Sequence, residues 1–187
     1  MLENMLPLVP FDGWSEHAMK EAAKRANINE ADLKRLFPEG VKECVGFFLS
    51  EEDKALADML PAEKLADLRI PERIEMIIMT RLKEWLPKRE VIRRTISFNT
   101  LPWNSVWAWK TLYNSVDSIW RMAGDKSTDF SFYTKRMTLA GIYSATLLFW
   151  LDDTSDNLEA TSQFLKRRPS NVAAFGHFKK QLAECSN

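Results

Sequence analysis

The feature that most constrains the fold is a run of fifteen residues without a charge. From Met137 to Leu151 the chain reads MTLAGIYSATLLFWL, in which eleven residues are apolar. This run is shorter than the ~20 apolar residues that a membrane-spanning helix needs. Two cations, Lys135 and Arg136, precede it, together with Phe132 and Tyr133. The run must therefore be buried against the rest of the chain, or presented to a lipid or a partner.

Apolar residues recur at helical spacing along the chain, and no alternating strand pattern persists. The sequence therefore predicts an all-α fold, with Ser15 and Asn29 as N-caps. The weakest boundary lies within residues 61–70, so we expect a small unit over 1–60 and a larger carboxy-terminal unit over 61–187. The predicted helices cover residues 1–11, 15–26, 30–37, 41–60, 71–87, 88–98, 102–123, 129–151 and a last region that starts near 155 and is broken at 169.

The charges balance, with 26 Lys plus Arg against 26 Asp plus Glu. Net charge therefore gives no argument for a nucleic acid or an acidic substrate. Cys44 and Cys185 match no metal or disulfide spacing, which favours a reducing compartment. Glu3 and Pro7 interrupt the first ten residues, which carry no secretory or transit pattern. We expect a soluble, cytoplasmic protein, or one that lies peripherally on the inner membrane.

Known catalytic patterns are missing from the sequence. His17 and His177 lie near no suitable carboxylate pair, and there is no Glu-x-x-His pair, glycine-rich phosphate loop or Gly-x-Ser-x-Gly elbow. Cys44 falls on an apolar helix face beside Val45 and Phe48, which is typical of a buried structural thiol. The sequence thus predicts no active site, no metal and no cofactor.

Residues 13–37 have the layout of a helix-turn-helix, similar to the amino-terminal unit of TetR-type regulators. The second helix carries more acids than cations between Asn27 and Gly40: Glu30, Asp32 and Glu39 against Lys34 and Arg35. Because cations supply most of the affinity for a phosphate backbone, we do not expect nucleic-acid binding. A ligand-responsive TetR-type transcription regulator is the alternative hypothesis.

Residues 101–124 carry four tryptophans on one predicted helix. Helical spacing places Trp109, Tyr113, Val116 and Trp120 on one stripe, and Trp103 with Trp107 on a second. The aromatic side chains form either a bulky core or the lining for an apolar ligand chain, with Met122, Met76 and Met79 as adaptable walls. The residues that we expect to contact a lipid are Trp103, Trp107, Trp109, Tyr113, Trp120, Met137 and Tyr143.

The aromatic residues and cations before the apolar run are the candidate partner surface. Phe132 and Arg136 share one helix face, and Tyr133 shares another with Met137. Arg136 is expected to lay its methylenes on apolar surface and keep its guanidinium in water. This indicates a patch of Phe132, Tyr133 and Arg136, while a paired cation at the start of a helix is the alternative.

Residues 163–182 hold five cations and no acid. An apolar stripe of Val172, Phe175, Phe178 and Leu182 runs through this segment. Such a basic amphipathic segment can lie on an anionic membrane, or it can dock on its own domain.

Three stretches carry a resemblance to a known family: GWSEHAM, LFPEG and, above all, AGDKSTDFSFYTKRMTLAGIY from Ala123 to Tyr143. Here the chain, from about Leu6 to about Phe175, resembles the ubiquinone-biosynthesis accessory family. These are lipid-binding proteins that assist the hydroxylase acting on demethoxyubiquinone.

The resemblance implies a TetR-like all-α fold without DNA binding, and a deep pocket for an isoprenoid quinone intermediate or a phospholipid. It also implies a hydroxylase-facing patch that includes Phe132 and Tyr133, where the family often has Trp in place of Phe132. We further expect a homodimer. The family's separate membrane helix is expected to be shortened or missing, since the sequence ends at Asn187.

Overall fold

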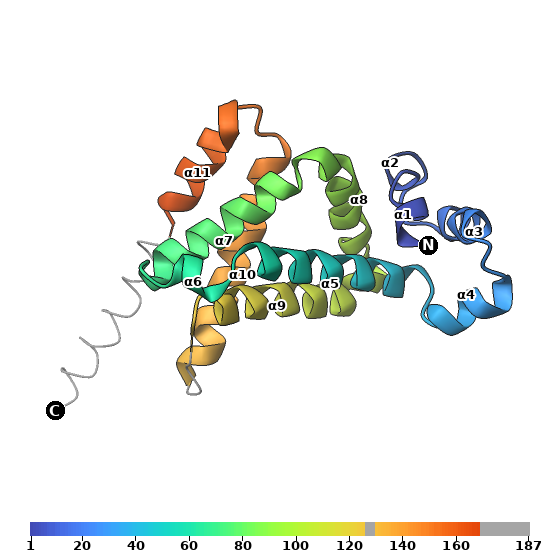
Figure 1. The fold of residues 1–187 in the computed structure, drawn as a ribbon, viewed down its shortest axis with the longest axis horizontal. Coiled ribbons are helices and arrows are strands. Elements are labelled where there is room, and N and C mark those ends of the chain that lie inside the picture. The colour runs from blue at the N-terminus through green and yellow to red at the C-terminus, as the bar shows by residue number, and fades with distance from the viewer. Residues whose placement is uncertain (126–129, 169–187) are drawn as a thin grey trace. The chain divides into compact units, whose positions relative to one another are not determined.

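The computed structural model describes residues 1–125 and 130–168, without the side chains of residues 130 and 131. Every regular element in these ranges is a helix (Figure 1). The predicted all-α fold is therefore confirmed. Two compact units divide the chain, and each is discontinuous in sequence.

The first unit comprises Met1–Met59 and Glu84–Ser115. Its amino-terminal helices are α1 (Leu2–Met5), α2 (Val9–Asp12), α3 (Glu16–Arg25), α4 (Glu30–Leu36) and α5 (Val41–Met59). They are followed, after residue 84, by η1 (Leu86–Lys88), α8 (Arg89–Asn99), η2 (Pro102–Asn104) and the first part of α9 (Ser105–Met122).

The second unit comprises Leu60–Lys83 and Val116–Asn187, of which the described part ends at Arg168. It holds α6 (Ala62–Leu65), nearly all of α7 (Ile70–Glu84) and the end of α9. The chain then continues through α10 (Phe130–Leu151), η3 (Asp156–Leu158) and α11 (Glu159–Lys166). The chain passes from the first unit to the second after Met59, close to the predicted boundary after residue 60. Residues 84–115, however, belong to the first unit. The roles given to residues 1–60 and 61–187 stay predictions.

The predicted N-caps are confirmed. The Ser15 hydroxyl accepts a hydrogen bond from the Ala18 amide at 3.1 Å, and the Asn29 side chain accepts one from the Asp32 amide at 2.9 Å. Two other expectations need correction. The single helix over residues 1–11 is two short helices, because Pro7 lacks the N–H that a continuous helix would use. Within residues 61–70, for which no helix was predicted, the chain forms α6.

The core of the first unit centres on Trp14 and α5. The Trp14 indole donates to the Thr95 hydroxyl at 2.8 Å, and its ring lies 5.6 Å from that of Phe48. Cys44 is fully buried, and burial raises the pKa of its thiol to about 12. The prediction of a buried structural thiol is thus confirmed.

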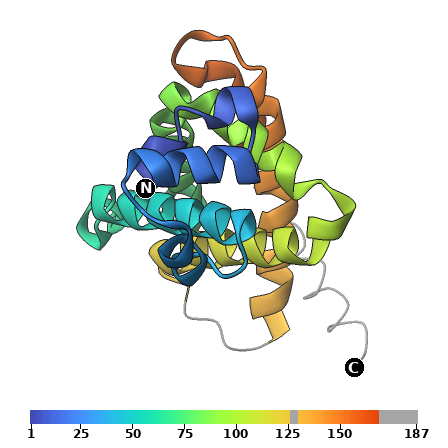
Figure 2. The same ribbon diagram turned by 90° about the vertical axis from the view of Figure 1, so that its right-hand side faces the viewer.

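Helices α5 and α9 lie side by side within the first unit, as both views show (Figures 1 and 2). The Lys42 ammonium donates to the Trp103 carbonyl at 3.4 Å. Further along, the Ser115 hydroxyl donates to Asp53 at 3.3 Å. At Gly46 an added Cβ would lie 3.2 Å from the Trp107 ring, so glycine lets this ring approach the backbone closely.

Two charged side chains, Arg73 and Asp153, hydrogen-bond to backbone groups at helix ends in the second unit. Arg73 donates to the carbonyls of Ala66, Leu68 and Ala123, at 2.9, 2.7 and 3.1 Å. Asp153 accepts from the amides of Ser155 and Thr161, at 2.8 and 2.9 Å, and from the Thr161 hydroxyl. Burial would raise the pKa of Asp153, but these hydrogen bonds outweigh it and hold the pKa at about 2.

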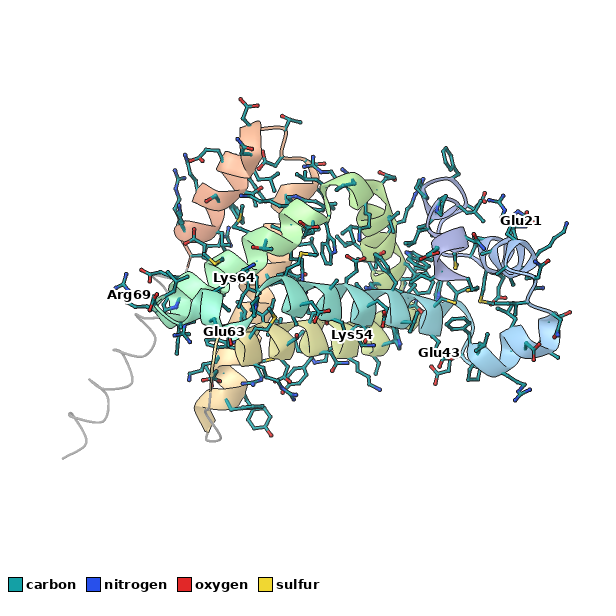
Figure 3. All side chains as sticks on the ribbon, viewed as in Figure 1. Glu21, Glu43, Lys54, Glu63, Lys64 and Arg69 are labelled. Atoms are coloured by element: carbon teal, nitrogen blue, oxygen red, sulfur yellow. The ribbon has the colours of Figure 1, made fainter. Side chains whose placement is uncertain are left out.

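Other charged side chains, among them Glu21, Lys54 and Arg69, lie at the surface (Figure 3). Arg25 pairs with Glu21 at 3.3 Å, Lys54 with Glu51 at 2.7 Å, and Arg69 with Glu72 at 2.5 Å. Pairs this exposed contribute little to stability, typically about 0–1 kcal/mol each. Packing and helix capping therefore stabilise the fold more than these surface charges do.

The end of α9 yields a test of the fold. Gly124 has a φ of +85°, and an added Cβ would lie 3.0 Å from an Arg73 guanidinium nitrogen. We expect Gly124→Ala to lower the free energy of unfolding by about 1–2 kcal/mol, the cost of a left-handed backbone in an L-residue. Urea unfolding followed by circular dichroism measures this change.

Gly141→Ala is the matched control. This glycine lies inside α10, and nothing would lie within 4 Å of its added Cβ. Alanine there should raise stability by roughly 0.5–1 kcal/mol, because it loses less backbone entropy on folding than glycine. Equal effects of the two substitutions would contradict the described turn after α9.

Candidate functional site

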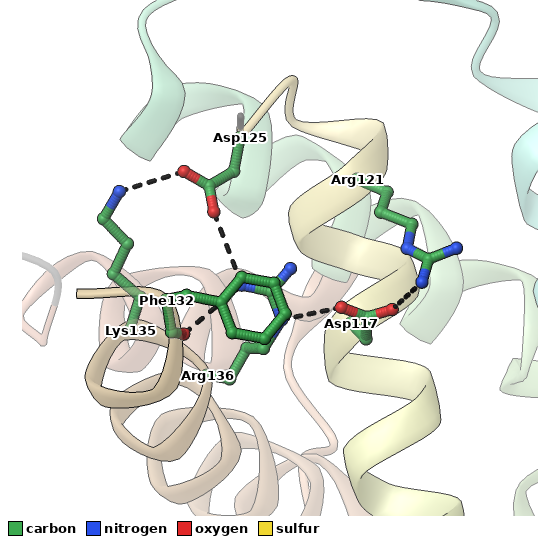
Figure 4. Close-up of polar contacts among 6 residues, drawn as sticks. All are labelled: Asp117, Arg121, Asp125, Phe132, Lys135 and Arg136. Atoms are coloured by element: carbon green, nitrogen blue, oxygen red, sulfur yellow. Dashed lines mark hydrogen bonds and ion pairs between the residues drawn. The ribbon is translucent and has the colours of Figure 1, made fainter. Parts of the chain in front are cut away.

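The guanidinium of Arg136 lies at the centre of a buried ion cluster in the second unit (Figure 4). Its Nε donates to Asp117 on α9 at 2.6 Å, and its Nη1 contacts Asp125, after the end of α9, at 3.4 Å. The side chains of Arg136 and Asp125 are 3% and 4% exposed. We call Asp117, Asp125, Lys135 and Arg136 the ion cluster.

Two further cations contact the carboxylates. Lys135 donates to Asp125 at 2.9 Å, while Arg121, on the solvent side, pairs with Asp117 at 2.7 Å. The Lys135 ammonium also lies 5.7 Å from the centre of the Trp120 ring. Each carboxylate thus contacts two cations, which offsets the cost of removing its charge from water.

The ring of Phe132 covers the cluster. Its centroid lies 3.3 Å from the guanidinium carbon of Arg136, and its backbone carbonyl accepts from the same guanidinium at 3.3 Å. A cation so close to an aromatic face is attracted by the ring quadrupole. Arg136 therefore fixes the first turns of α10 through one ring, one carbonyl and two carboxylates.

The expectation that Arg136 keeps its guanidinium in water is wrong. The alternative, a paired cation at the start of a helix, is what the structure has. The partners of Arg136 are Asp117 on α9 and Asp125 in the turn after α9. Helical spacing within α10 cannot predict them. The Asp125 that follows Gly124 was the available signal, since a helix-ending glycine often lets the next residue turn back over the helix.

On α10, Tyr133 and Met137 have 63% and 53% of their surface exposed. The rings of Phe132 and Tyr133 meet edge to face, with 5.2 Å between centroids. The structure thus separates the predicted patch into an exposed part, Tyr133, and an anchored part, Phe132 with Arg136. We call Tyr133 and Met137 the α10 face.

The residues predicted to contact a lipid fall into both units. Trp103, Trp107, Trp109 and Tyr113 belong to the first unit, and Trp120, Met137 and Tyr143 to the second. They do not share one environment. Trp103 and Trp109 are 72% and 47% exposed, whereas Trp120 and Tyr143 are buried. Tyr143 accepts a hydrogen bond from buried Arg81 at 3.2 Å. Lipid contact by this set stays a prediction.

A groove in the second unit was not found by sequence reasoning. Its volume is about 630 Å³, and its apolar lining includes Met76 and Met79. The sequence marked this methionine pair as adaptable, but the opposite wall depends on how α11 packs on α7. The other lining residues are Leu68, Glu72, Glu75, Thr80, Lys83, Asn157, Glu159 and Ser162.

Among the described residues, no group of three or more His, Cys, Asp and Glu side chains is placed to hold a metal ion. No helix within residues 1–125 and 130–168 is long and apolar enough to cross a membrane. Residues 126–129, and all of the segment 163–182 beyond Arg168, lie outside the described residues.

Comparison with solved structures identifies the class of fold. The crystal structure of a TetR transcriptional regulator from Nitrosomonas europaea ATCC 19718 matches with a TM-score of 0.70 and 23% sequence identity. The match covers 92% of this chain and 95% of that chain. The protein therefore has the TetR-like fold that its sequence resemblance implied.

Sequence relatives identify the family. The COQ9 family model matches residues 107–176. The ubiquinone biosynthesis protein COQ9, mitochondrial, of Xenopus tropicalis is 35% identical over 98% of this chain. The protein of that name from Schizosaccharomyces pombe is 32% identical, also over 98% of this chain. The chain spans 60% of the frog protein's length and 73% of the yeast protein's. It belongs to the COQ9 family.

The ion cluster provides a stability prediction. Arg136→Met leaves Asp117 and Asp125 partly uncompensated away from water, so we expect it to lower the free energy of unfolding by about 3–5 kcal/mol. Chemical denaturation of the purified protein measures the loss.

Arg121→Met is the control, since it removes another partner of Asp117 from a side chain that is 77% exposed. This substitution should cost less than about 1 kcal/mol. If both variants lose the same stability, the cluster is not buried as described.

Proposed function

We propose that the chain acts in ubiquinone biosynthesis as a non-catalytic, lipid-binding accessory protein. It binds an isoprenoid quinone intermediate or a phospholipid and presents substrate to the membrane-bound demethoxyubiquinone hydroxylase. The names of its COQ9 relatives support the pathway. The resemblance of residues 123–143 to the accessory family supports the hydroxylase as partner.

The observation that supports the hydroxylase contact is the exposed Tyr133, which packs against Phe132 beside the ion cluster. The Tyr133 side chain keeps 63% of its surface exposed in the folded chain, so that surface is available to a partner. Phe132 packs against it, and the ion cluster holds Phe132. Because an aromatic anchor binds more tightly when its rotamers are restricted beforehand, this arrangement suits a protein interface.

The lipid part of the proposal answers a physical difficulty. A long isoprenoid tail leaves a bilayer at a cost of about 0.8 kcal/mol for each exposed methylene, so a protein that shelters part of the tail lowers that barrier. The apolar surface available includes Met137 on α10 and Met76 in the groove, which are 53% and 39% exposed. Methionine side chains adapt to irregular chains without a fixed shape.

A non-catalytic role fits the state of Cys44, the cysteine within the described residues. The thiolate is the nucleophilic form of cysteine, and a thiol with a pKa of about 12 is almost entirely protonated at neutral pH.

The proposal also includes a homodimer and peripheral contact with a membrane.

A ligand-responsive transcription regulator is the second candidate, favoured by the TetR-like fold alone. The cations of α4 are already paired within the helix, Lys34 with Glu30 at 3.4 Å and Arg35 with Asp32 at 3.8 Å. A helix with paired cations releases few counterions from DNA, which weakens binding. Salt-sensitive retention on heparin or genomic DNA would favour this candidate over the first.

Tyr133→Ala tests the partner surface. We expect hydroxylase binding to weaken by about thirtyfold, the loss of roughly 2 kcal/mol that is common for an interface aromatic. The free energy of unfolding should change by less than about 0.5 kcal/mol, because the side chain is exposed. A pull-down titration and a melting curve on the same sample measure both quantities.

The control is Phe11→Ala, which truncates a ring that is 85% exposed in the first unit. This variant should bind the hydroxylase as well as the unchanged protein does. A large fall in melting temperature for Tyr133→Ala, or equal loss of binding in the control, would refute the assignment of Tyr133.

Lipid binding has its own test. Gently purified protein should carry isoprenoid quinones or phospholipids, since buried apolar chains dissociate slowly into water. Organic extraction followed by mass spectrometry identifies them. An empty protein from a strain that makes ubiquinone would count against the lipid part of the proposal while leaving the hydroxylase contact open.

A further inference from the structure

Helix α9 exposes a row of large apolar side chains in the first unit. Trp103 in η2 is 72% exposed, and Val106 and Trp109 in α9 are 85% and 47% exposed. These residues are three apart in sequence, so they follow one side of the chain as it enters the helix. Tyr113, four residues further on, is partly exposed on the same side. We call Trp103, Val106 and Trp109 the α9 face.

The neighbouring side of this segment is packed against the rest of the first unit. Asn104 is fully buried, and its side chain donates to the Phe98 carbonyl at 2.8 Å. The Trp107 ring meets Phe98 edge to face at 6.4 Å and closes over Gly46. These contacts fix the rotation of α9 about its axis. The α9 face therefore cannot turn inward and stays in contact with solvent unless something else covers it.

The segment that carries this face holds charge of one sign. Between residues 100 and 116 the sequence contains Lys110 and no acid. Lys110 is exposed, next to Trp109 and one helical turn after Val106. Lys42, from α5, reaches the Trp103 carbonyl. An apolar row with cations at its margin complements an apolar layer that is bordered by anions.

We propose that the α9 face docks on the surface of an anionic lipid bilayer. Trp103 and Trp109 then lie at the level of the headgroups, where the apolar body and the N–H of an indole are both satisfied. Val106 enters the acyl boundary, and Lys110 and Lys42 lie near lipid phosphates.

The shape of the face distinguishes a bilayer from a second protein. Val106 and Trp103 protrude, since most of their surface is free of contact. A protruding side chain needs either a matching hollow in a protein or a deformable layer that opens around it. Lys110 and Lys42 favour the deformable layer, because copies of this chain would bring the same cations together.

The inference deepens the proposed function by naming a surface that brings the protein to its substrate's membrane. It rests on that function for the biological meaning of the lipid. It does not involve residues 169–187, and it is independent of the α10 face.

Vesicle co-sedimentation of the full chain tests the docking. The probes are phosphatidylcholine vesicles with and without phosphatidylglycerol. The variant Trp103→Ser/Val106→Ser should bind the anionic vesicles at least about tenfold more weakly, since each large apolar side chain contributes that factor when buried. The control Phe11→Ser/Leu36→Ser removes two other exposed apolar side chains of the first unit and should bind unchanged.

The charge part has a separate readout. Lys110→Gln should weaken binding to anionic vesicles by about fivefold and leave binding to neutral vesicles unchanged. Lipids brominated on their acyl chains should quench the tryptophan fluorescence of the unchanged protein, and quench Trp103→Phe less. If the double variant does not fold, the lysine variant and the quenching measurement decide.

Equal vesicle binding by the double variant and the unchanged protein would overturn the inference. The inference would also be overturned if the double variant lost self-association but still bound vesicles, because a second copy of the chain would then be what covers the α9 face. Failure of Tyr133→Ala to weaken hydroxylase binding would contradict the proposed function without affecting vesicle docking.

Discussion

The buried guanidinium of Arg136 is the interaction on which the rest of the second unit's surface depends. It joins α10 to α9 through Asp117 and to the turn after α9 through Asp125. A charge in this position is stable only while its partners stay in place, so the cluster holds the start of α10 in one arrangement. That arrangement keeps Phe132 over the guanidinium and leaves Tyr133 in solvent.

Two exposed faces result from two different kinds of packing. In the second unit a polar cluster positions the α10 face. In the first unit, close contact of Trp107 with Gly46 and Phe98 orients the α9 face. The function proposed above needs surfaces for both the membrane and the enzyme. Each unit provides one candidate, and each candidate is fixed by contacts within its own unit.

Local features of the sequence predicted the helices well. Ser15 and Asn29 bond amides three residues further on, and such contacts depend on neighbouring residues alone. The apolar stripe of Ile74, Ile77, Ile78 and Leu82 is buried on α7 because helical periodicity determines which residues share a face. The short helix α6 was missed because four residues are too few to show a period.

The sequence by itself determined the all-α fold, the boundaries of the longer helices to within a few residues and, through residues 123–143, the family. The tertiary structure alone decided which aromatic and charged side chains reach the surface. Trp109 and Trp120 share a predicted stripe, yet one is 47% exposed and the other is buried. Arg136 was expected in water and is enclosed. Exposure depends on residues brought together from distant parts of the chain, such as Asp117 with Arg136 or Gly46 with Trp107, and the spacing within one helix carries no information about them.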